Sequence, residues 1–214
     1  GVLRMSLLTS GTFIPAVSPL ITFSLIGVML SAMLCSRQTD MKSLIAFSSV
    51  SHMGLVIAAA MVKTQWSIVG SMMMMISHGL VSSALFCLAN ASYERLHSRT
   101  LLVLQGSQII IPLIGAWWLV TTLMNLALPP SPSFMGEMSM LASLFQWSNF
   151  TLLVTGCAVI FTTLYSLYMF WSAQRGRSSL LAKNSPPLHT REHLLFALHV
   201  FPALLLIFCP DLMY

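Results

Sequence analysis

Residues 109–146 most constrain the fold, because this apolar run is too long for one membrane span. As one straight helix its 38 residues would measure about 57 Å at 1.5 Å per residue. The hydrocarbon core of a bilayer is about 30 Å thick. The segment PPSPS at residues 129–133 interrupts the run, and proline removes a backbone donor and clashes with the preceding helical turn. The sequence therefore predicts a break near Pro129–Pro132.

Five further apolar runs are long enough to cross a bilayer, which takes about 20 residues of helix. They are residues 16–35, 43–62, 67–90, 150–171 and 193–210. Hydrophobic residues make up 57% of the 214-residue chain and charged residues only 7%, whereas soluble domains carry about 25% charged residues. This composition excludes a soluble domain. It predicts an all-α fold, a single polytopic transmembrane bundle over residues 1–214 with about six spans, one of them discontinuous.

The basic residues distinguish one discontinuous span from two separate spans in 109–146. With one span, eight of them fall on one side of the membrane: Arg37, Lys42, Arg95, Arg99, Arg175, Arg177, Lys183 and Arg191. The other side keeps Lys63 and Arg4. Two spans would move the last four of the eight across the membrane. Because inner-side loops are enriched in Lys and Arg, we expect one discontinuous span. The net charge of +5 comes from basic residues in the loops between apolar runs. A membrane protein explains this distribution better than a nucleic-acid partner does.

Residues 90–100 and 172–192 are polar, and we expect them to form loops on the basic side of the membrane. Aromatic residues with a polar edge are enriched where a span meets the lipid headgroups. Five such residues lie near expected span ends: Trp66, Trp147, Tyr165, Tyr168 and Trp171. We therefore expect these five side chains at the membrane surface.

Glu137 lies a few residues beyond the prolines, near the start of the second half of the broken span. Broken helices at membrane depth persist only inside protein or beside a water-filled cavity, and transporters place ion sites at such breaks. Burial disfavours a charged carboxyl group while a helix N-terminus favours it, so a group between these effects can bind and release a proton. The alternative is an acidic helix-end residue without a transport role. Acidic residues within membranes are functional by default, which favours proton transfer.

His52 and His78 each lie near the middle of an expected span. At helical spacing, Ser48 and Ser49 lie one turn before His52, while Ser71 and Ser82 share a face with His78. Serine hydroxyls can hold water, and imidazole is the side chain best suited to relay protons near pH 7. Alternatively, these stripes only hold helices together. Two histidines and an acidic residue in one small bundle favour a proton path.

Lys42 opens the second span, about 15 Å along the helix from His52. It either feeds the proton path from the basic side or extends its ammonium group to the interface. His199 precedes Pro202 in the last span, where we expect it to pack at a kink. The four methionines at 72–75 are expected to face lipid or pack between helices, because no Met, His or Cys partner recurs at a spacing that suits copper.

The four cysteines lie far apart, in or beside apolar runs: Cys35, Cys87, Cys157 and Cys209. Their spacing matches neither iron–sulfur ligation nor other metal sites, so we expect them to pack as small apolar residues. The sequence also lacks a dinucleotide-binding fingerprint. We therefore expect no redox centre or other cofactor on this chain.

Four blocks of sequence carry a family resemblance: RQTDMKSLIAFSSVSHMGLV, MISHGLVSSALFCLANASYERLHSRT, WWLVTTLMNLALPPSPSFMGE and LYSLYMFWSAQRG. They closely resemble the antiporter-like membrane subunits of the mitochondrial proton-pumping NADH:ubiquinone oxidoreductase, respiratory complex I. The similarity extends in the same order over all 214 residues. The resemblance implies a helical bundle built from two inverted repeats, each with a broken helix.

The resemblance also implies roles for the candidate residues. Glu137 matches the acidic residue of the second broken helix, taken as the group on the proton-exit side, and His52 and His78 match histidines of a central polar axis. Lys42 belongs to a matching segment of threonine, aspartate and lysine. The family's glutamate–lysine pair and central lysine would lie before Gly1, so we expect a C-terminal fragment with the second half of the machinery.

As a whole, the resemblance implies a membrane-arm subunit of the H⁺-translocating NADH:ubiquinone reductase. It would lie in the mitochondrial inner membrane with its basic loops facing the matrix, in contact with lipid and with other membrane-arm subunits. NADH, flavin, iron–sulfur clusters and ubiquinone would be bound elsewhere in the complex. One alternative is a stand-alone cation/proton antiporter, which acts without redox partners. Another is a structural scaffold, in which neutralising Glu137, His52 and His78 would leave transport unchanged.

Overall fold

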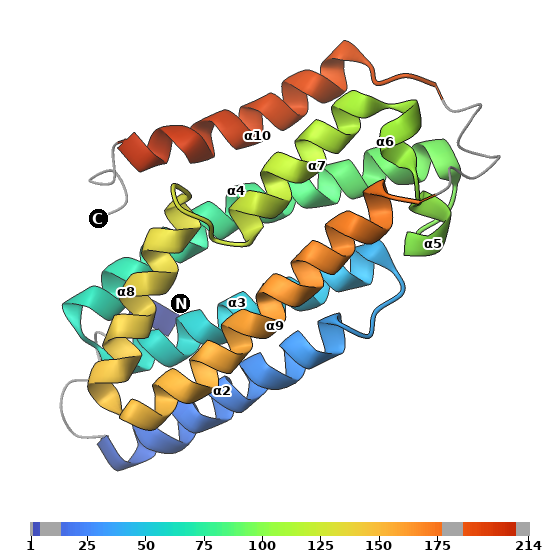
Figure 1. Cartoon of the computed structure of the whole chain (residues 1–214). Helices are drawn as coiled ribbons and strands as arrows, with labels where there is room; N and C mark the ends of the chain where they lie inside the picture. The colour runs from blue at the N-terminus through green and yellow to red at the C-terminus, as the bar shows by residue number, and fades with distance from the viewer. Residues whose placement is uncertain (1, 5–13, 177–185, 209–214) are drawn as a thin grey trace.

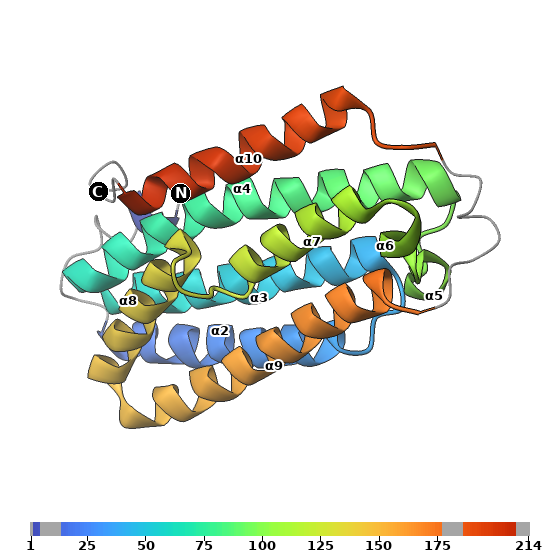
Figure 2. The same cartoon turned by 45° about the horizontal axis from the view of Figure 1, so that its top comes forward.

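The chain forms a bundle of helices in a computed structural model that describes residues 2–4, 14–176 and 186–208. The helices are α2 (Ile14–Cys35), α3 (Met41–Val62), α4 (Gln65–Leu96), α5 (Leu101–Leu104), α6 (Ser107–Ile110), α7 (Pro112–Asn125), α8 (Pro132–Trp147), α9 (Asn149–Gln174) and α10 (Thr190–Phe208). The long helices run side by side, with α10 on the outside of the bundle (Figures 1 and 2). The expected all-α fold is confirmed.

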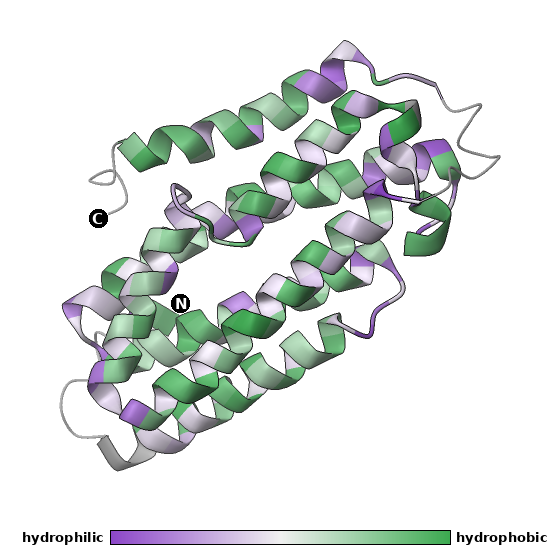
Figure 3. Ribbon diagram, in the orientation of Figure 1, coloured by the Kyte–Doolittle hydropathy of each residue, from purple (hydrophilic) through white to green (hydrophobic). Residues whose placement is uncertain are grey.

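Five of the helices are long and apolar enough to cross a membrane, namely α2, α3, α4, α9 and α10. They match the five expected runs within a few residues, except that α4 extends further and that residues 209 and 210 lie outside the described part. Apolar residues cover the lengths of these helices, and polar residues gather toward the ends of the bundle (Figure 3). This distribution fits a body surrounded by lipid and capped by polar loops.

The fourth span is discontinuous, as the prolines predict. With 14 and 16 residues, α7 and α8 measure about 21 Å and 24 Å, and neither alone crosses a core of about 30 Å. The first half begins at Pro112 instead of residue 109, because proline starts a helix readily at its first position but interrupts one further in. The preceding segment Leu101–Ile109 makes an angle of 115° with α7, so it does not lengthen the span.

Residues 126–131 form the break, and several of their backbone groups bond locally. Leu126 N–H donates to Thr122 O at 2.9 Å, and Ser131 N–H donates to Leu128 O at 2.7 Å. Ser131 also caps α8, since its hydroxyl oxygen accepts from Phe134 N–H at 3.3 Å. The break contains a cis peptide bond between Pro129 and Pro130. Local hydrogen bonds of this kind reduce the cost of irregular backbone at membrane depth.

The loops that carry basic residues meet at one end of the bundle. An antiparallel bridge joins Asp40, before α3, to Thr100, after α4, and Ser107 Oγ of α6 donates to Ala173 O near the end of α9. Six basic residues of the described part belong to this end: Arg37, Lys42, Arg95, Arg99, Arg175 and Arg191. Lys63 caps the other end of α3. Arg177 and Lys183 lie outside the described residues.

The expectation that residues 90–100 form a loop is wrong for the first seven of them, because α4 runs on to Leu96. This stretch contains good helix formers such as Ala91, Glu94 and Leu96, and Ala91 and Leu96 are buried against the bundle. The helix ends at His97, which adopts a left-handed conformation with a φ of 49°. At 32 residues, α4 is about 48 Å long and extends beyond the lipid core.

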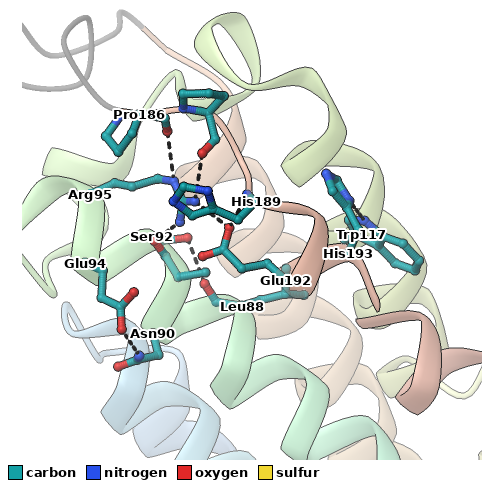
Figure 4. Close-up of polar contacts among 12 residues, drawn as sticks. Leu88, Asn90, Ser92, Glu94, Arg95, Trp117, Pro186, His189, Glu192 and His193 are labelled. Carbon is teal, nitrogen blue, oxygen red and sulfur yellow. Dashed lines mark hydrogen bonds and ion pairs between the residues drawn. The ribbon is translucent and has the colours of Figure 1, made fainter. Parts of the chain in front are cut away.

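Arg95, in the last turn of α4, holds the start of α10. Its Nη2 donates to Glu192 Oε2 at 2.6 Å, and its guanidinium also donates to the carbonyl oxygens of Pro186 and Pro187, at 3.1 Å and 3.3 Å. Figure 4 shows this group of contacts around the ion pair. Because arginine presents several donors in one plane, a single side chain fixes both the loop and the helix that follows it.

Four of the five aromatic residues that we expect at the membrane surface lie on the outside of the bundle. Trp66, Trp147, Tyr168 and Trp171 are exposed. Tyr165 is the exception: only 1% of it is exposed, and it packs in the main apolar cluster. The expectation failed because it considered distance along the helix alone, whereas Tyr165 projects from α9 toward the inside of the bundle.

Candidate functional site

The candidate site begins with a contact between an unbroken helix and the second half of the broken one. His52 Nδ1 of α3 lies 3.4 Å from Glu137 Oε1 of α8. The His52 side chain is 3% exposed and that of Glu137 is 12% exposed, so both are largely shielded. The sequence places these residues 85 positions apart, and the fold makes them direct neighbours.

His78 of α4 completes the cluster. Its ring centroid lies 5.5 Å from that of His52, and the two rings are tilted by 51°. The Nε2 atoms of both histidines are buried and have no hydrogen-bond partner among the described residues. Buried polar atoms nearly always have a partner in the protein or in ordered water. The three expected residues, Glu137, His52 and His78, thus come together from three different helices.

A close crossing of α4 and α8 sets the position of Glu137. A Cβ atom added to Gly136 would lie 3.0 Å from Met74 N and 3.2 Å from Gly70 O, so only glycine allows this approach without a shift. Gly70 faces Gly136 from the other helix, where an added Cβ would lie 3.1 Å from Gly136 O. Close backbone approach through small residues is typical of helices in membranes. Here it brings the residue next to Gly136 up to α3.

The helix N-terminus contributes less to this site than the sequence suggested. α8 begins at Pro132, so Glu137 lies in the second turn, and the effect of the helix dipole falls off within the first. The nearest partner of its carboxyl group among the described residues is the imidazole of His52. The electrostatic environment of Glu137 is therefore set mainly by a group that can itself gain or lose a proton.

The expected serine stripes are present, but the hydroxyl groups of Ser48, Ser49 and Ser71 bond to their own helices. Ser48 Oγ donates to Ile45 O at 2.7 Å and Ser71 Oγ to Ser67 O at 2.6 Å. Ser49 bonds in the same way, to Ala46 O at 2.6 Å. A hydroxyl oxygen that donates its single proton still has lone pairs that can accept. The stripes can therefore accept hydrogen bonds from water or from neighbouring groups. Ser82 is half-buried.

A further hydroxyl contact near the cluster was missed by the sequence analysis. Ser51 Oγ of α3 lies 3.4 Å from the hydroxyl of Tyr165 in α9, and both residues are 1% exposed. Ser51 directly precedes His52 in the chain. The only signal in the sequence was a tyrosine two helical turns from the end of a span, which equally suits a residue at the membrane surface.

Lys42 does not join the cluster. It lies at the basic end of the bundle, where its Nζ donates to Asn90 Oδ1 at 3.2 Å and sits 4.9 Å from the centre of the Tyr93 ring. Asn90 in turn donates to Glu94 Oε1 at 2.8 Å. The ammonium group is thus held by α4 at the end of the span. This position suits both open alternatives, an entrance to a proton path and an anchor at the interface.

The remaining candidates lie outside the cluster. His199 Nδ1 is 2.8 Å from Leu195 O of its own helix. Of the four methionines, Met73 and Met74 are buried while Met72 and Met75 are exposed, so the run both packs between helices and faces outward.

No group of three or more His, Cys, Asp or Glu residues in the described part of the chain has the geometry to hold a metal ion. Cys35, Cys87 and Cys157 are free thiols, and Cys209 lies outside the described part.

The arrangement of His52 and Glu137 allows one proton to be held in two ways. If Glu137 is ionised, a protonated His52 donates from Nδ1 to the carboxylate. If Glu137 is protonated, its hydroxyl donates to Nδ1 of a neutral imidazole. The same two atoms face each other in both states, so exchange needs no large movement. The site is therefore suited to loading and releasing a proton inside a membrane.

Comparison with known proteins identifies the family. A model of the family described as NADH:quinone oxidoreductase/Mrp antiporter, TM matches residues 1–164. The chain belongs to this family. The matched residues contain three of the four sequence blocks, and the membership confirms the family resemblance.

The most similar curated relatives include two proteins named NADH-ubiquinone oxidoreductase chain 4. That of Scyliorhinus canicula is 56% identical over 196 residues, which cover 92% of this chain and 43% of the relative. That of Gadus morhua is 50% identical over 214 residues, covering 100% of this chain and 46% of the relative. The chain thus spans somewhat less than half the length of these relatives.

A solved structure shares the fold. A chain in respiratory complex I from Thermus thermophilus with bound NADH superposes with a TM-score of 0.83 at 24% sequence identity. The superposition covers 91% of this chain and 41% of that one. The helical bundle of this chain therefore has the same fold as part of a chain in that solved complex.

Proposed function

We propose that this chain is part of the membrane arm of the proton-pumping NADH:ubiquinone oxidoreductase and forms part of its proton path. The observation that carries the proposal is the buried cluster of His52, His78 and Glu137 beside a broken span. The names of the relatives, NADH-ubiquinone oxidoreductase chain 4, support the same assignment. In this role the chain is a proton-translocating subunit, and other subunits of the same enzyme oxidise NADH.

The cluster works as a site whose proton affinity depends on neighbouring charge. A change of one pKa unit corresponds to about 1.4 kcal/mol, which a modest movement of one charge supplies in a shielded environment. Electron transfer elsewhere in the complex alters charge pairing along the polar axis. Glu137 and His52 then exchange a proton, and His78 continues the path through its Nε2 atom.

The chain's own residues supply the proton-carrying groups, while NADH, flavin, iron–sulfur clusters and ubiquinone belong to other subunits. This division rests on the sequence, which has no iron–sulfur cysteine spacing and no dinucleotide fingerprint. The partners are other membrane-arm subunits and lipid. Exposed leucine and phenylalanine side chains along α2 and α10 provide apolar surface for such contacts.

The chain lies in the mitochondrial inner membrane with its basic end toward the matrix. The proposal is supported by the clustering of six basic residues at one end of the bundle, against Lys63 at the other end of α3, and by the enrichment of Lys and Arg in inner-side loops. Lys42 lies at this basic end. It is the candidate for the group that takes up protons from the matrix side.

A second candidate function is a stand-alone cation/proton antiporter, because the family description covers Mrp antiporters as well as NADH:quinone oxidoreductase. The two functions differ in their driving force. Sealed vesicles that hold the complete complex will acidify on addition of NADH and stop when electron transfer is inhibited. The antiporter function instead requires proton movement driven by a sodium or potassium gradient alone, with no dependence on NADH. That result would replace the proposal.

A further inference from the structure

Tyr165 is a buried ionisable residue that the proposed path does not use. It is 1% exposed and packs among apolar residues that include Leu44, Ile45 and Met169. A buried tyrosine hydroxyl is costly unless it has a polar partner. Among the described residues, the hydroxyl of Tyr165 contacts Ser51 Oγ, at 3.4 Å. The contact links α9 to α3 through two hydroxyl groups inside the bundle.

The direction of this hydrogen bond follows from the second contact of Ser51. Ser51 Oγ donates to Ser48 O at 2.8 Å. A hydroxyl has one proton to donate, so Ser51 accepts from Tyr165 and the phenolic proton points to Ser51. The lone pairs of the Tyr165 hydroxyl oxygen are then available to accept a hydrogen bond from water.

The hydroxyl pair lies next to the proposed proton site. Ser51 directly precedes His52 in α3, so the contact with Tyr165 joins α9 to the turn of α3 that carries His52. This contact differs from the hydrogen bonds of Ser48 and Ser71 in the serine stripes, which stay within their own helices. It therefore offers a connection from α9 to the level of the cluster.

We propose that Tyr165 and Ser51 form a branch of the proton path that joins α9 to the His52–Glu137 pair. The proposal rests on the proposed function. In one transfer, the Tyr165 oxygen accepts a proton from a hydronium ion and passes its own proton to Ser51 Oγ. Ser51 then breaks its bond to Ser48 O, turns its original proton away from that carbonyl and releases it toward the His52–Glu137 pair. Each oxygen ends with the number of protons it had at the start, and only O–H bonds form and break.

The test replaces Tyr165 by phenylalanine in the complete subunit of the assembled complex. Tyr165→Phe keeps the buried ring and removes the hydroxyl. Loss of a positioned proton-transfer group typically lowers a rate by a factor of about 100 or more, so we expect at least a tenfold fall in NADH-driven proton flux with normal assembly. Tyr168→Phe is the matched control: it lies one turn further along α9 and is 48% exposed. We expect it to keep wild-type flux.

Variants of Ser51 separate a proton-carrying role from a packing role. Ser51→Ala removes the acceptor and is expected to lower the flux as Tyr165→Phe does, whereas Ser51→Thr keeps a hydroxyl and is expected to retain most of it. Because the two groups act in one branch, Ser51→Ala combined with Tyr165→Phe should be no worse than the lower single variant. Fully additive losses would contradict a shared branch.

Wild-type flux in Tyr165→Phe would overturn the branch. If Tyr165→Phe fails to assemble, the comparison of Ser51→Ala with Ser51→Thr decides, and equal flux in these two would also overturn it. Glu137→Gln measured in the same series separates the two proposals. A loss in Glu137→Gln with wild-type flux in Tyr165→Phe removes only the branch, whereas wild-type flux in both removes the proposed function as well.

Discussion

His52 Nδ1 lies 3.4 Å from Glu137 Oε1, and this contact depends on the break in the fourth span. A continuous helix through residues 109–146 would carry Glu137 along a straight axis. The chain ends α7 at Asn125 and restarts at Pro132, and α8 then runs in a different direction from α7 (Figure 2). In this position Gly136 meets Gly70. The break thus brings an acidic residue to a histidine on another helix.

His52→Gln is expected to abolish most of the proton pumping while the complex still assembles. Glutamine can hydrogen-bond to Glu137 but cannot take up a proton, so the exchange across the 3.4 Å contact is lost. A positioned acid–base group contributes a factor of about 100 or more to a rate. The check is NADH-driven acidification of sealed vesicles. His189→Gln, an exposed residue of the loop before α10, is the control and should leave pumping unchanged.

Lys42→Gln is expected to lower pumping less than His52→Gln does. The ammonium group is bound by Asn90 at the end of the span, so its loss affects the supply of protons and leaves the cluster intact. Pumping should therefore fall most clearly when protons are scarce, at alkaline pH on the basic side. Measuring the rate in vesicles from pH 6 to pH 9 on that side tests this; an unchanged profile identifies Lys42 as an interfacial anchor.

Gly136→Ala is expected to destabilise the subunit by about 1–3 kcal/mol, as overpacking does. The new Cβ would lie 3.0 Å from Met74 N and 3.2 Å from Gly70 O, and backbone atoms cannot turn away. The amount of assembled complex after mild heating measures the effect. Gly156→Ala on α9 is the matched control, because a Cβ there meets nothing within 4 Å. Equal thermal stability of the two variants would show that α4 and α8 do not approach closely.

Arg95→Ala is expected to release the start of α10 and to cost about 1.5–3 kcal/mol, because Glu192 loses the guanidinium and keeps the His189 N–H as a donor. The guanidinium also leaves two carbonyl oxygens, of Pro186 and Pro187, without their donor. Limited proteolysis of the loop before α10 in the assembled complex reports the release. Arg191→Ala removes an exposed basic residue at the same end and should not raise the cleavage rate. Similar cleavage in both variants contradicts the role assigned to Arg95.

Much of this fold follows from the sequence because membrane spans depend on length and apolar content. The five continuous spans and the break between Asn125 and Pro132 were predicted on that basis. The extension of α4 to Leu96 was missed, because a helix can continue beyond the lipid through polar residues that are good helix formers. Amino-acid composition therefore predicts which segments span the membrane better than it predicts where each helix ends.

The candidate residues were predictable individually, but their contacts were not. Glu137, His52 and His78 stand out because ionisable residues are rare within membranes. Their distances depend on the crossing of α4 and α8, which two glycines 66 positions apart make possible. Tyr165 was assigned to the membrane surface because only its distance from the span end was considered. Which side of α9 faces the bundle is decided by tertiary packing.

The most direct test of the account is the number of protons pumped per NADH oxidised by the assembled complex with Glu137→Gln in the complete subunit. Glutamine preserves the shape and polarity of the side chain but cannot release a proton. We predict a loss of pumping, of turnover or of both, because Glu137 and His52 can no longer exchange a proton. A wild-type rate together with a wild-type ratio would contradict the account and leave Glu137 as a structural residue of α8.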